Sequence, residues 1–201
     1  LKVLEAYREL FPETGLDALC GLEGEMFKRI QNRRTFRIQR GGRGFFLKCH
    51  QGVGWHEIVK NLLAFRLPVL GAMNEWHAIR RLRELGVETM QPVAVGRSGW
   101  NPARQRSLLV TEELTNCVSL EDYCRRWVDA PPPPVWRWRL VRRLAEVART
   151  LHENGVNHRD FYLCHFLIGQ PWDGREESLH LYLIDLHRVQ LRRRTPERWR
   201  V

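Results

Sequence analysis

The stretch that decides the fold is His158-Arg159-Asp160-Phe161-Tyr162-Leu163-Cys164-His165-Phe166-Leu167-Ile168. It follows a helical pattern that ends at Asn154-Gly155, because glycine readily adopts the conformation that terminates a helix. It begins with charged residues and ends with the apolar residues of a predicted strand. Asp160 is therefore expected on a loop between two packed elements, which is a frequent position for a functional side chain.

A second aspartate, Asp185, follows the strand that alternation predicts at residues 179–184. Residues 166–168 and 179–184 are predicted to pair as a hairpin, which would bring Asp160 and Asp185 to the same end. Two carboxylates placed this way suit phosphoryl transfer, since Asp160 can accept a hydroxyl proton while Asp185 holds Mg²⁺. Two solvated aspartates at loop ends would show the same spacing, so the pair alone does not decide the function.

Earlier in the chain, residues 35–40 and 45–50 are predicted as two strands joined by Gly41-Gly42-Arg43-Gly44, and residues 26–31 are a possible third. Lys48 lies in the second strand of this hairpin. A lysine on a strand is ordinarily a solvated edge residue, so its interpretation depends on what faces it.

The following helix, predicted at residues 74–85 with Asn74 as its cap, supplies that residue. Glu75, Ile79 and Leu82 recur at helical spacing, which places the glutamate on the packed side. A carboxylate that faces a core needs a cation. We therefore expect Glu75 to pair with Lys48, the arrangement with which kinases hold the phosphates of ATP.

A short strand at residues 108–111 leads into Thr111-Glu112-Glu113-Leu114. In a kinase this is where the lobes join, so Glu112, Glu113 and Leu114 are candidates for nucleotide contact through their backbone groups. Five features follow one another in the order found in kinases. They are a lysine on a strand, a glutamate on the next helix, a segment that joins the lobes, a His-Arg-Asp motif and an aspartate after a strand. The sequence predicts an α+β, bilobal, protein-kinase-like fold, with an antiparallel-sheet N-lobe over residues 1–114 and a helical C-lobe over residues 115–201.

Two features depart from the protein-kinase pattern. The glycine-rich phosphate loop is missing, because the connection expected to carry it, residues 31–35, contains no glycine. The position five residues after Asp160, where protein kinases have a metal-binding asparagine, is His165. An imidazole can ligate a metal but suits Mg²⁺ less well than oxygen. His165 is therefore expected in the site, as a candidate metal ligand beside Asp185.

The composition limits the function classes. The chain has 201 residues, of which 43% are hydrophobic and 28% charged, as in a globular protein. No apolar run approaches the roughly 20 residues of a membrane span, and the first ten residues do not resemble a secretory signal, so a cytoplasmic protein is expected. Five cysteines without close pairing predict reduced thiols.

The net charge of +10 indicates an anionic partner: nucleic acid, an anionic membrane face, a phosphorylated substrate or a small acidic protein. Nucleic acid would require aromatic platforms on a basic face, and we expect most of the eight tryptophans in the core. No nucleic-acid partner is therefore predicted. A small acidic protein stays a possible partner.

The stretch from His158 to Ile168 resembles that of the lipopolysaccharide core heptose(I) kinases, and the likeness extends from about residue 24 to residue 200. Further similar stretches are Asn61-Leu62-Leu63, Leu67-Pro68-Val69-Leu70-Gly71-Ala72, Glu75-Trp76, Ala78-Ile79-Arg80-Arg81-Leu82, Thr111-Glu112-Glu113-Leu114 and Ile184-Asp185-Leu186-His187-Arg188. The length of these stretches makes the resemblance specific.

The resemblance implies use of ATP and Mg²⁺ and a sugar hydroxyl on nascent lipopolysaccharide, or its core oligosaccharide, as the acceptor. It implies a protein peripheral at the cytoplasmic face of the inner membrane of a Gram-negative bacterium. His165 and the missing glycine loop are both expected within such a family. Its members continue with further helices past the position of Arg198-Trp199-Arg200, so the C-lobe of this chain is expected to be incomplete.

The main hypothesis is an ATP-dependent kinase that phosphorylates a heptose of the lipopolysaccharide inner core. Its roles are Asp160 as base, Asp185 with His165 at the metal, Lys48 on the phosphates and Glu75 orienting Lys48. The alternative is a catalytically weak kinase-like module that binds nucleotide or an acidic partner, which His165 and the absent glycine loop would suit.

Overall fold

The computed structural model describes residues 1–13, 15–30, 32–63 and 71–193. The chain divides into two compact units. The first comprises Leu1–His77 and Gln91–Glu113, and the second comprises Ala78–Met90 and Leu114–Val201. The predicted assignment of lobes to residues 1–114 and 115–201 stays a prediction. Among the helices in the described ranges, none combines the length and apolarity that a membrane crossing requires.

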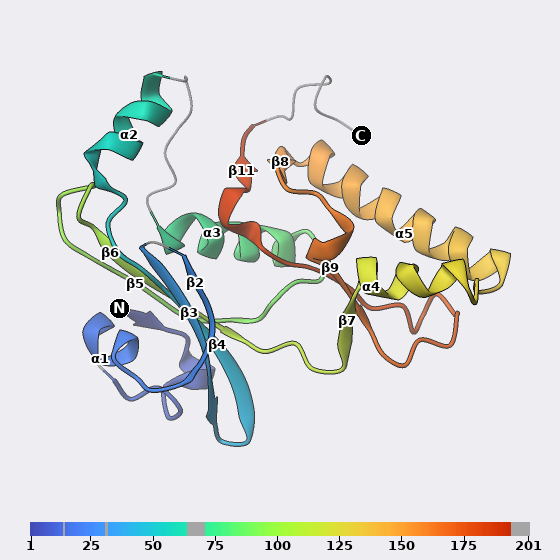
Figure 1. The fold of residues 1–201 in the computed structure, drawn as a ribbon, viewed down its shortest axis with the longest axis horizontal. Coiled ribbons are helices and arrows are strands. Elements are labelled where there is room, and N and C mark those ends of the chain that lie inside the picture. Colours follow the sequence, from blue (N-terminus) through green and yellow to red (C-terminus); the bar gives the residue numbers. More distant parts are fainter. Residues whose placement is uncertain (14, 31, 64–70, 194–201) are drawn as a thin grey trace. The chain divides into compact units, whose positions relative to one another are not determined.

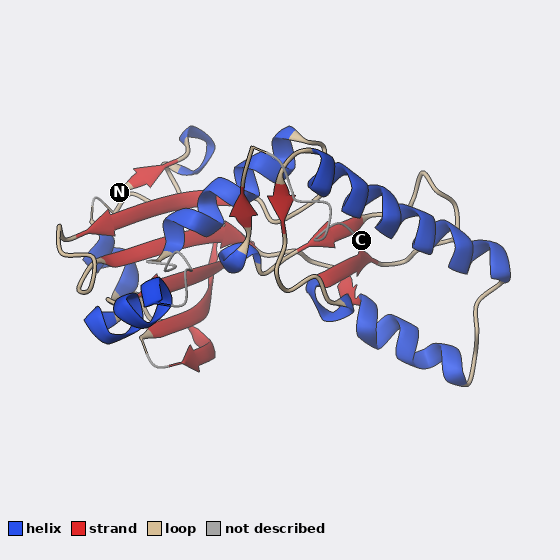
Figure 2. Cartoon of the chain, turned by 90° about the horizontal axis from the view of Figure 1, so that it is seen from above, coloured by secondary structure: helices blue, strands red, loops and turns tan. Residues whose placement is uncertain are grey.

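The first unit is built on a six-stranded antiparallel sheet in the order β1-β5-β6-β4-β3-β2 (Figures 1 and 2). Its strands are β1 (Lys2–Val3), β2 (Glu25–Ile30), β3 (Arg33–Arg40), β4 (Arg43–His50), β5 (Pro92–Ser98) and β6 (Arg106–Glu112). The predicted strands are confirmed as β2, β3, β4 and β6, although residue 31 lies outside the described residues. The strands β1 and β5 were not predicted.

The hairpin between β3 and β4 turns at Gly41-Gly42, whose φ angles are +54° and +73°. Two successive positive φ angles match the right-handed twist of the strands in a two-residue turn, and glycine adopts them without steric cost. The structure therefore confirms these glycines as a hairpin connection. Arg43 and Gly44 belong to β4, where Gly44 leaves room for the carboxylate of Glu113.

Alternation along β4 separates a core face from a functional face. Phe45, Leu47 and Cys49 are buried, whereas Phe46 and Lys48 are half-buried on the other side. The core cluster of the first unit consists of Tyr7, Phe11, Leu16, Leu19, Phe36, Ile38, Phe45, Leu47, Cys49, Val93, Ala94, Leu108 and Val110. Side chains alternate across a pleated strand, so the same pattern that fills the core carries Lys48 to the opposite face.

Cys49 forms a disulfide with Cys20 at the end of α1 (Leu16–Cys20). The prediction that all five cysteines are reduced is wrong for this pair. The two residues are 29 positions apart in the sequence, and they meet because α1 packs on β5 and β6. Such packing leaves no signal in cysteine spacing. Cys117, Cys124 and Cys164 are free thiols.

Two helices interrupt the sheet, α2 (Gly54–Leu63) and α3 (Ala72–Glu84). The structure describes α2 up to Leu63, and residues 64–70, including part of one family-like stretch, lie outside the described residues. The prediction that Asn74 caps the next helix is wrong, since α3 begins at Ala72. There the hydroxyl of Ser107 in β6 accepts the Ala72 N–H at 2.9 Å, and so caps the helix from a distant strand.

The second unit is organised around α5 (Pro134–Glu153) and two small sheets (Figure 1). One sheet has the order β10-β9-β7 and the other pairs β11 with β8. Its strands are β7 (Cys117–Ser119), β8 (Val156–Asn157), β9 (Phe166–Gly169), β10 (Leu181–Leu183) and β11 (Gln190–Leu191). The short helices are α4 (Leu120–Arg125), η2 (Arg126–Val128), η3 (Leu163–His165) and η4 (Leu186–Arg188), and the first unit contains η1 (Glu5–Tyr7).

The sequence accounts for both ends of α5. The helix starts at Pro134, where a missing N–H costs nothing, after a run of three further prolines. Leu140, Ala148 and Leu151 are buried on one side of the helix, and Leu144 on the same stripe is half-buried. At the other end Gly155 has a φ of +71°, which stops the helix and turns the chain into β8.

The tryptophans contradict the expectation that most of the eight lie in the core. Within the described ranges, Trp76 and Trp172 are buried, whereas Trp55, Trp100 and Trp138 are more than half exposed. The exposed rings lie on α2, the β5–β6 connection and α5, which are separate elements. Helical periodicity identified Trp76, but the remaining tryptophans have no apolar repeat that would have predicted their burial or exposure.

Candidate active site

Lys48 and Glu75 form a buried ion pair in the first unit. Lys48 is fixed in β4 between Thr35 of β3 and Leu109 of β6, and Glu75 lies in the first turn of α3. The Lys48 Nζ lies 2.5 Å from Glu75 Oε1, and the two side chains are 13% and 0% exposed. The predicted pair is therefore present. Glu75 orients the ammonium group, while the contact of Lys48 with phosphate stays a prediction.

The side chains of Glu112 and Glu113, at the predicted joining segment, are held by arginines of the sheet. Arg37 donates from Nε and Nη2 to Glu113 at 2.8–3.0 Å, and Arg43 donates to Glu112 at 2.6 Å. The Tyr7 hydroxyl also donates to Glu112, and burial and this carboxylate raise the pKa of Tyr7. These acidic side chains anchor the segment to β3 and β4.

The backbone of the joining segment is already partly used. The N–H of Glu112 donates to Gln91 O and the N–H of Glu113 donates to Gly44 O, both at 2.9 Å. The N–H groups of Glu112 and Glu113 are therefore already engaged, and Leu114 is half-buried. The predicted nucleotide contact of Glu112, Glu113 and Leu114 stays a prediction.

In the second unit, β8 delivers Asp160 on the loop that the sequence predicted. Its carboxylate is 14% exposed and accepts a hydrogen bond from Arg188 Nη1 at 2.8 Å. The backbone oxygen of Asp160 contacts His165 Nδ1 at 2.7 Å, and the same oxygen accepts from Tyr162 N. The loop is thus tied to the turn that leads into β9.

Asp185 follows β10 and lies close to His165, as the hairpin predicted. Leu183 pairs with Phe166 at that end of the β9–β10 hairpin. Asp185 has left-handed dihedrals, φ 56° and ψ 53°, which are uncommon for a residue with a side chain and concentrate at functional sites. Its Oδ1 lies 2.7 Å from His187 Nδ1, and its Oδ2 lies 3.6 Å from His165 Nε2.

The Asp185 carboxylate is a ligand that suits Mg²⁺, whereas the ring nitrogen of His165 suits it less well. A carbonyl oxygen can only accept, so His165 Nδ1 donates to Asp160 O, and Nε2 is the ring nitrogen that faces Asp185. The described residues contain no group of three or more His, Cys, Asp or Glu able to hold a metal. Mg²⁺ commonly binds one or two carboxylates together with substrate phosphates and water.

His158, two residues before Asp160, contacts the segment that carries Asp185. It is buried, and its Nε2 contacts the backbone oxygen of Ile184 at 3.2 Å, next to Asp185. Burial lowers the pKa of His158, because the charged ring would lose its hydration. Sequence reasoning assigned no role to His158, His187 or Arg188. Their presence in the family-like stretches was the available signal.

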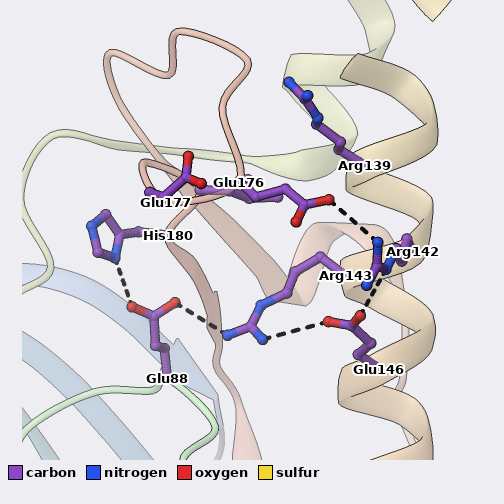
Figure 3. A pocket seen from close by; sticks show the side chains of 9 residues that line it. Glu88, Arg139, Arg142, Arg143, Glu146, Glu176, Glu177 and His180 are labelled. Atoms are coloured by element: carbon purple, nitrogen blue, oxygen red, sulfur yellow. Dashed lines mark hydrogen bonds and ion pairs between the residues drawn. The ribbon is translucent and has the colours of Figure 1, made fainter. Parts of the chain in front are cut away.

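A pocket of about 340 Å³ lies in the second unit between α5 and the β9–β10 connection (Figure 3). Glutamates and arginines dominate its lining, which consists of Glu88, Arg139, Arg142, Arg143, Glu146, Glu176, Glu177, Leu179 and His180. Two of the arginines face carboxylates: Arg143 pairs with Glu88 and Glu146, and Arg142 pairs with Glu146 and Glu176 (Figure 3). The third, Arg139, donates to the backbone oxygen of Gly174. Because these charges are compensated within the lining, the pocket offers little excess charge to a phosphate.

The structure groups the predicted residues into two sets, Lys48 with Glu75 in the first unit and Asp160, His165 and Asp185 in the second. An antiparallel sheet with a strand lysine and a helix glutamate, followed by a helical unit with an Asp-bearing loop and hairpin, defines a protein-kinase-like α+β fold. A solved structure described as WaaP in complex with acyl carrier protein matches the whole chain and 77% of its own length, with a TM-score of 0.81 and 39% identity. The predicted fold class is confirmed.

The chain belongs to the lipopolysaccharide kinase (Kdo/WaaP) family, whose model matches residues 17–201. It is 50% identical over 179 residues to the lipopolysaccharide core heptose(I) kinase WaaP of Escherichia coli, an alignment that covers 89% of this chain and 68% of that protein. The protein of the same name from Pseudomonas aeruginosa is 49% identical over 184 residues, covering 92% of this chain and 69% of that protein. The predicted family is confirmed.

Proposed function

We propose that this chain is an ATP-dependent kinase that phosphorylates a heptose of the lipopolysaccharide inner core. The observation that carries the proposal is its 48–50% identity to three heptose(I) kinases. The lysine–glutamate pair and the Asp160–Asp185 cluster support it, because they are the chemical groups that phosphoryl transfer requires. The net charge of +10 suits an acidic acceptor.

In the proposed mechanism Lys48, oriented by Glu75, binds the α- and β-phosphates of ATP. Asp185 and His165 would hold Mg²⁺, which supplies charge neutralisation at the phosphates when bound. Asp160 orients the heptose hydroxyl and accepts its proton. In a loose phosphoryl-transfer transition state the proton leaves late, so Asp160 acts more through orientation than through basicity. The backbone carbonyls near Glu113 and Leu114 contact the base of the nucleotide.

The test is mass spectrometry of core oligosaccharide after incubation with ATP and Mg²⁺. Wild type is expected to add one phosphate to a heptose, Asp160→Ala to add essentially none, and the exposed-site control Asp129→Ala to behave as wild type. Robust phosphorylation of protein substrates without any of the glycolipid would overturn the proposal. Mg²⁺-dependent nucleotide binding without transfer to the acceptor would favour the catalytically weak alternative.

We further propose a small acidic carrier protein as a partner and peripheral association with the membrane that holds the lipid-linked acceptor. The support for the first is the solved neighbour, which is in complex with acyl carrier protein, together with the basic charge of this chain. Co-purification with acyl carrier protein that weakens as salt increases is expected. Flotation with anionic lipid vesicles tests membrane association, and a protein that stays with the soluble fraction at low salt would contradict it.

A further inference from the structure

Arg188 is the one cation that contacts the Asp160 carboxylate among the described residues. Its Nη1 donates to Asp160 Oδ1 at 2.8 Å. The proposed reaction needs Asp160 to receive a hydroxyl, yet this guanidinium already occupies one of its oxygens. The contact therefore places a positive charge directly beside the carboxylate that, in the proposed function, receives the acceptor hydroxyl.

The backbone holds Arg188 in this position. Arg188 ends η4, and the turn closes with a hydrogen bond from Val189 N to Leu186 O at 3.1 Å. Two residues later Gln190 pairs with Asn157 in the β11–β8 ladder, and Asn157 lies three residues before Asp160. The strands that flank the two residues are thus paired with each other, which fixes the approach of the arginine to the aspartate.

The guanidinium has capacity beyond this contact. It carries five N–H donors in a planar fork, and Asp160 engages Nη1 alone. In the described part of the chain, Nε and Nη2 have no partner, and the side chain is 45% exposed. Arg142 and Arg143 of the Figure 3 pocket differ, because each pairs with two carboxylates. Arg188 therefore has an inner edge, Nη1, that is bound to Asp160. Its outer edge, formed by Nε and Nη2, is available to a ligand.

We propose that the outer edge of Arg188 binds an oxyanion of the acceptor, a carboxylate or a phosphate next to the heptose hydroxyl that Asp160 receives. This inference rests on the proposed function and adds the group that selects an acidic acceptor. A guanidinium fork matches both oxyanions with two parallel hydrogen bonds. One arginine then contacts the base and the acceptor together, so that binding of the anion aligns the hydroxyl with Asp160.

The experiment measures kcat and KM for wild type, Arg188→Gln and Arg188→Lys with three acceptors: native core oligosaccharide, its carboxyl-reduced form and its dephosphorylated form. With the native acceptor, Arg188→Gln is expected to lose about 10- to 100-fold in kcat/KM, mainly through KM, the range of a charge-assisted hydrogen bond. Wild type should show a comparable loss with whichever modified acceptor lacks the recognised anion. On that acceptor Arg188→Gln should lose little more, and Arg188→Lys should recover part of the activity on the native one.

The matched control is Arg149→Gln, which removes one exposed arginine from α5 and should not discriminate among the acceptors. If Arg188→Gln lost the same factor in kcat/KM on all three acceptors, through kcat, Arg188 would only position Asp160. That result would overturn this inference but not the proposed function. A wild type that uses all three acceptors equally would also overturn it, without any variant having to fold. A wild type inactive on every acceptor would overturn the proposed function and this inference with it.

Discussion

The lysine–glutamate pair and the aspartate cluster are built in opposite ways. Lys48 and Glu75 lie on a central strand and a helix, with side chains 13% and 0% exposed. Asp160 and Asp185 lie on a loop and a tight turn, one beside an arginine and the other between histidines. In the first arrangement the glutamate is completely buried, whereas in the second the side chains of Asp160 and Asp185 are 14% and 28% exposed and have several polar partners.

Because of this difference, substitutions in the lysine–glutamate pair should affect folding stability, whereas substitutions in the aspartate cluster should affect mainly the reaction. A buried charge with one partner becomes uncompensated when that partner is removed, so the surrounding fold bears the cost. A partly exposed carboxylate can be hydrated when its partners are lost, so its removal affects the reaction more than the fold. In the proposed function the first pair would bind the ATP phosphates, which are the same in every turnover, and the second would receive the acceptor.

The largest effect is expected from Lys48→Met. The substitution keeps an unbranched side chain but leaves the Glu75 carboxylate buried without its cation, at a cost of about 3–5 kcal/mol in the free energy of unfolding. Urea denaturation measures it. Lys48→Met/Glu75→Leu should regain much of the stability and still bind ATP poorly. A single variant as stable as wild type would show that the pair is hydrated in solution and remove the basis of the comparison.

The next effect is expected from Asp185→Asn, with a turnover about 10³-fold lower and a free energy of unfolding within about 1 kcal/mol of wild type. Asparagine tolerates the left-handed dihedrals at this position, so the backbone need not move. Asp185→Ala is the informative control, because it adds backbone strain to the loss of the carboxylate. Wild-type turnover of Asp185→Asn at saturating Mg²⁺ would rule out Asp185 as the metal ligand.

Asp160→Ala should reduce turnover by about 10²-fold or more, the range for a general base, while the affinity for ATP stays near that of wild type. Isothermal titration with a non-hydrolysable nucleotide and steady-state kinetics on the same preparation separate the two quantities. A structural role for Asp160 predicts a lower melting temperature together with lost nucleotide binding. A folded, binding and fully active variant would end the assignment of Asp160 as the base.

The sequence predicted those parts of the fold whose signals are local. Spacing of Glu75 with Ile79 and Leu82 placed the glutamate in the core, and alternation in β4 placed Lys48 opposite Phe45 and Leu47. The β9–β10 hairpin brought Asp185 close to His165 and the loop that carries Asp160, as expected. Each of these predictions depended on residues fewer than ten positions apart, or on a simple return of the chain.

The missed features depend on distant partners. The strand β5 begins with proline and carries five buried residues in succession, so it has no alternation to detect. Ser107 caps α3 from a strand 35 residues away, which made Asn74 a wrong choice of cap. The β11–β8 pairing brings the segment of Arg188 to that of Asp160, and it joins residues 33 and 35 positions apart, Gln190 with Asn157 and Leu191 with Val156.

The smallest effect concerns His158, the buried residue beneath the polar cluster. Its Nε2 donates to Ile184 O, and its Nδ1 has no hydrogen-bond partner among the described residues, so an added proton would be buried without compensation. Burial lowers the pKa of His158 below its ordinary value of 6.5. Above pH 6.5 the ring is neutral in both states. Below pH 6.5 His158 binds a proton in the unfolded chain but not in the folded chain. The free energy of unfolding therefore decreases as the pH is lowered, until the pKa of the folded state is reached.

His158→Gln tests this sign, since glutamine keeps an N–H donor near the position of Nε2 but does not titrate. Between pH 7.5 and pH 5.5 wild type should lose about 1 kcal/mol more unfolding free energy than the variant, with about 1.4 kcal/mol per pH unit as the upper limit for one proton. Urea denaturation at both pH values, in a chelator, measures the difference and cancels the titration of other groups. Equal losses would mean that the folded ring accepts the proton as readily as the unfolded one. The contact with Ile184 would then not depend on a neutral imidazole, and the burial that separates this residue from the exposed histidines would have no energetic consequence.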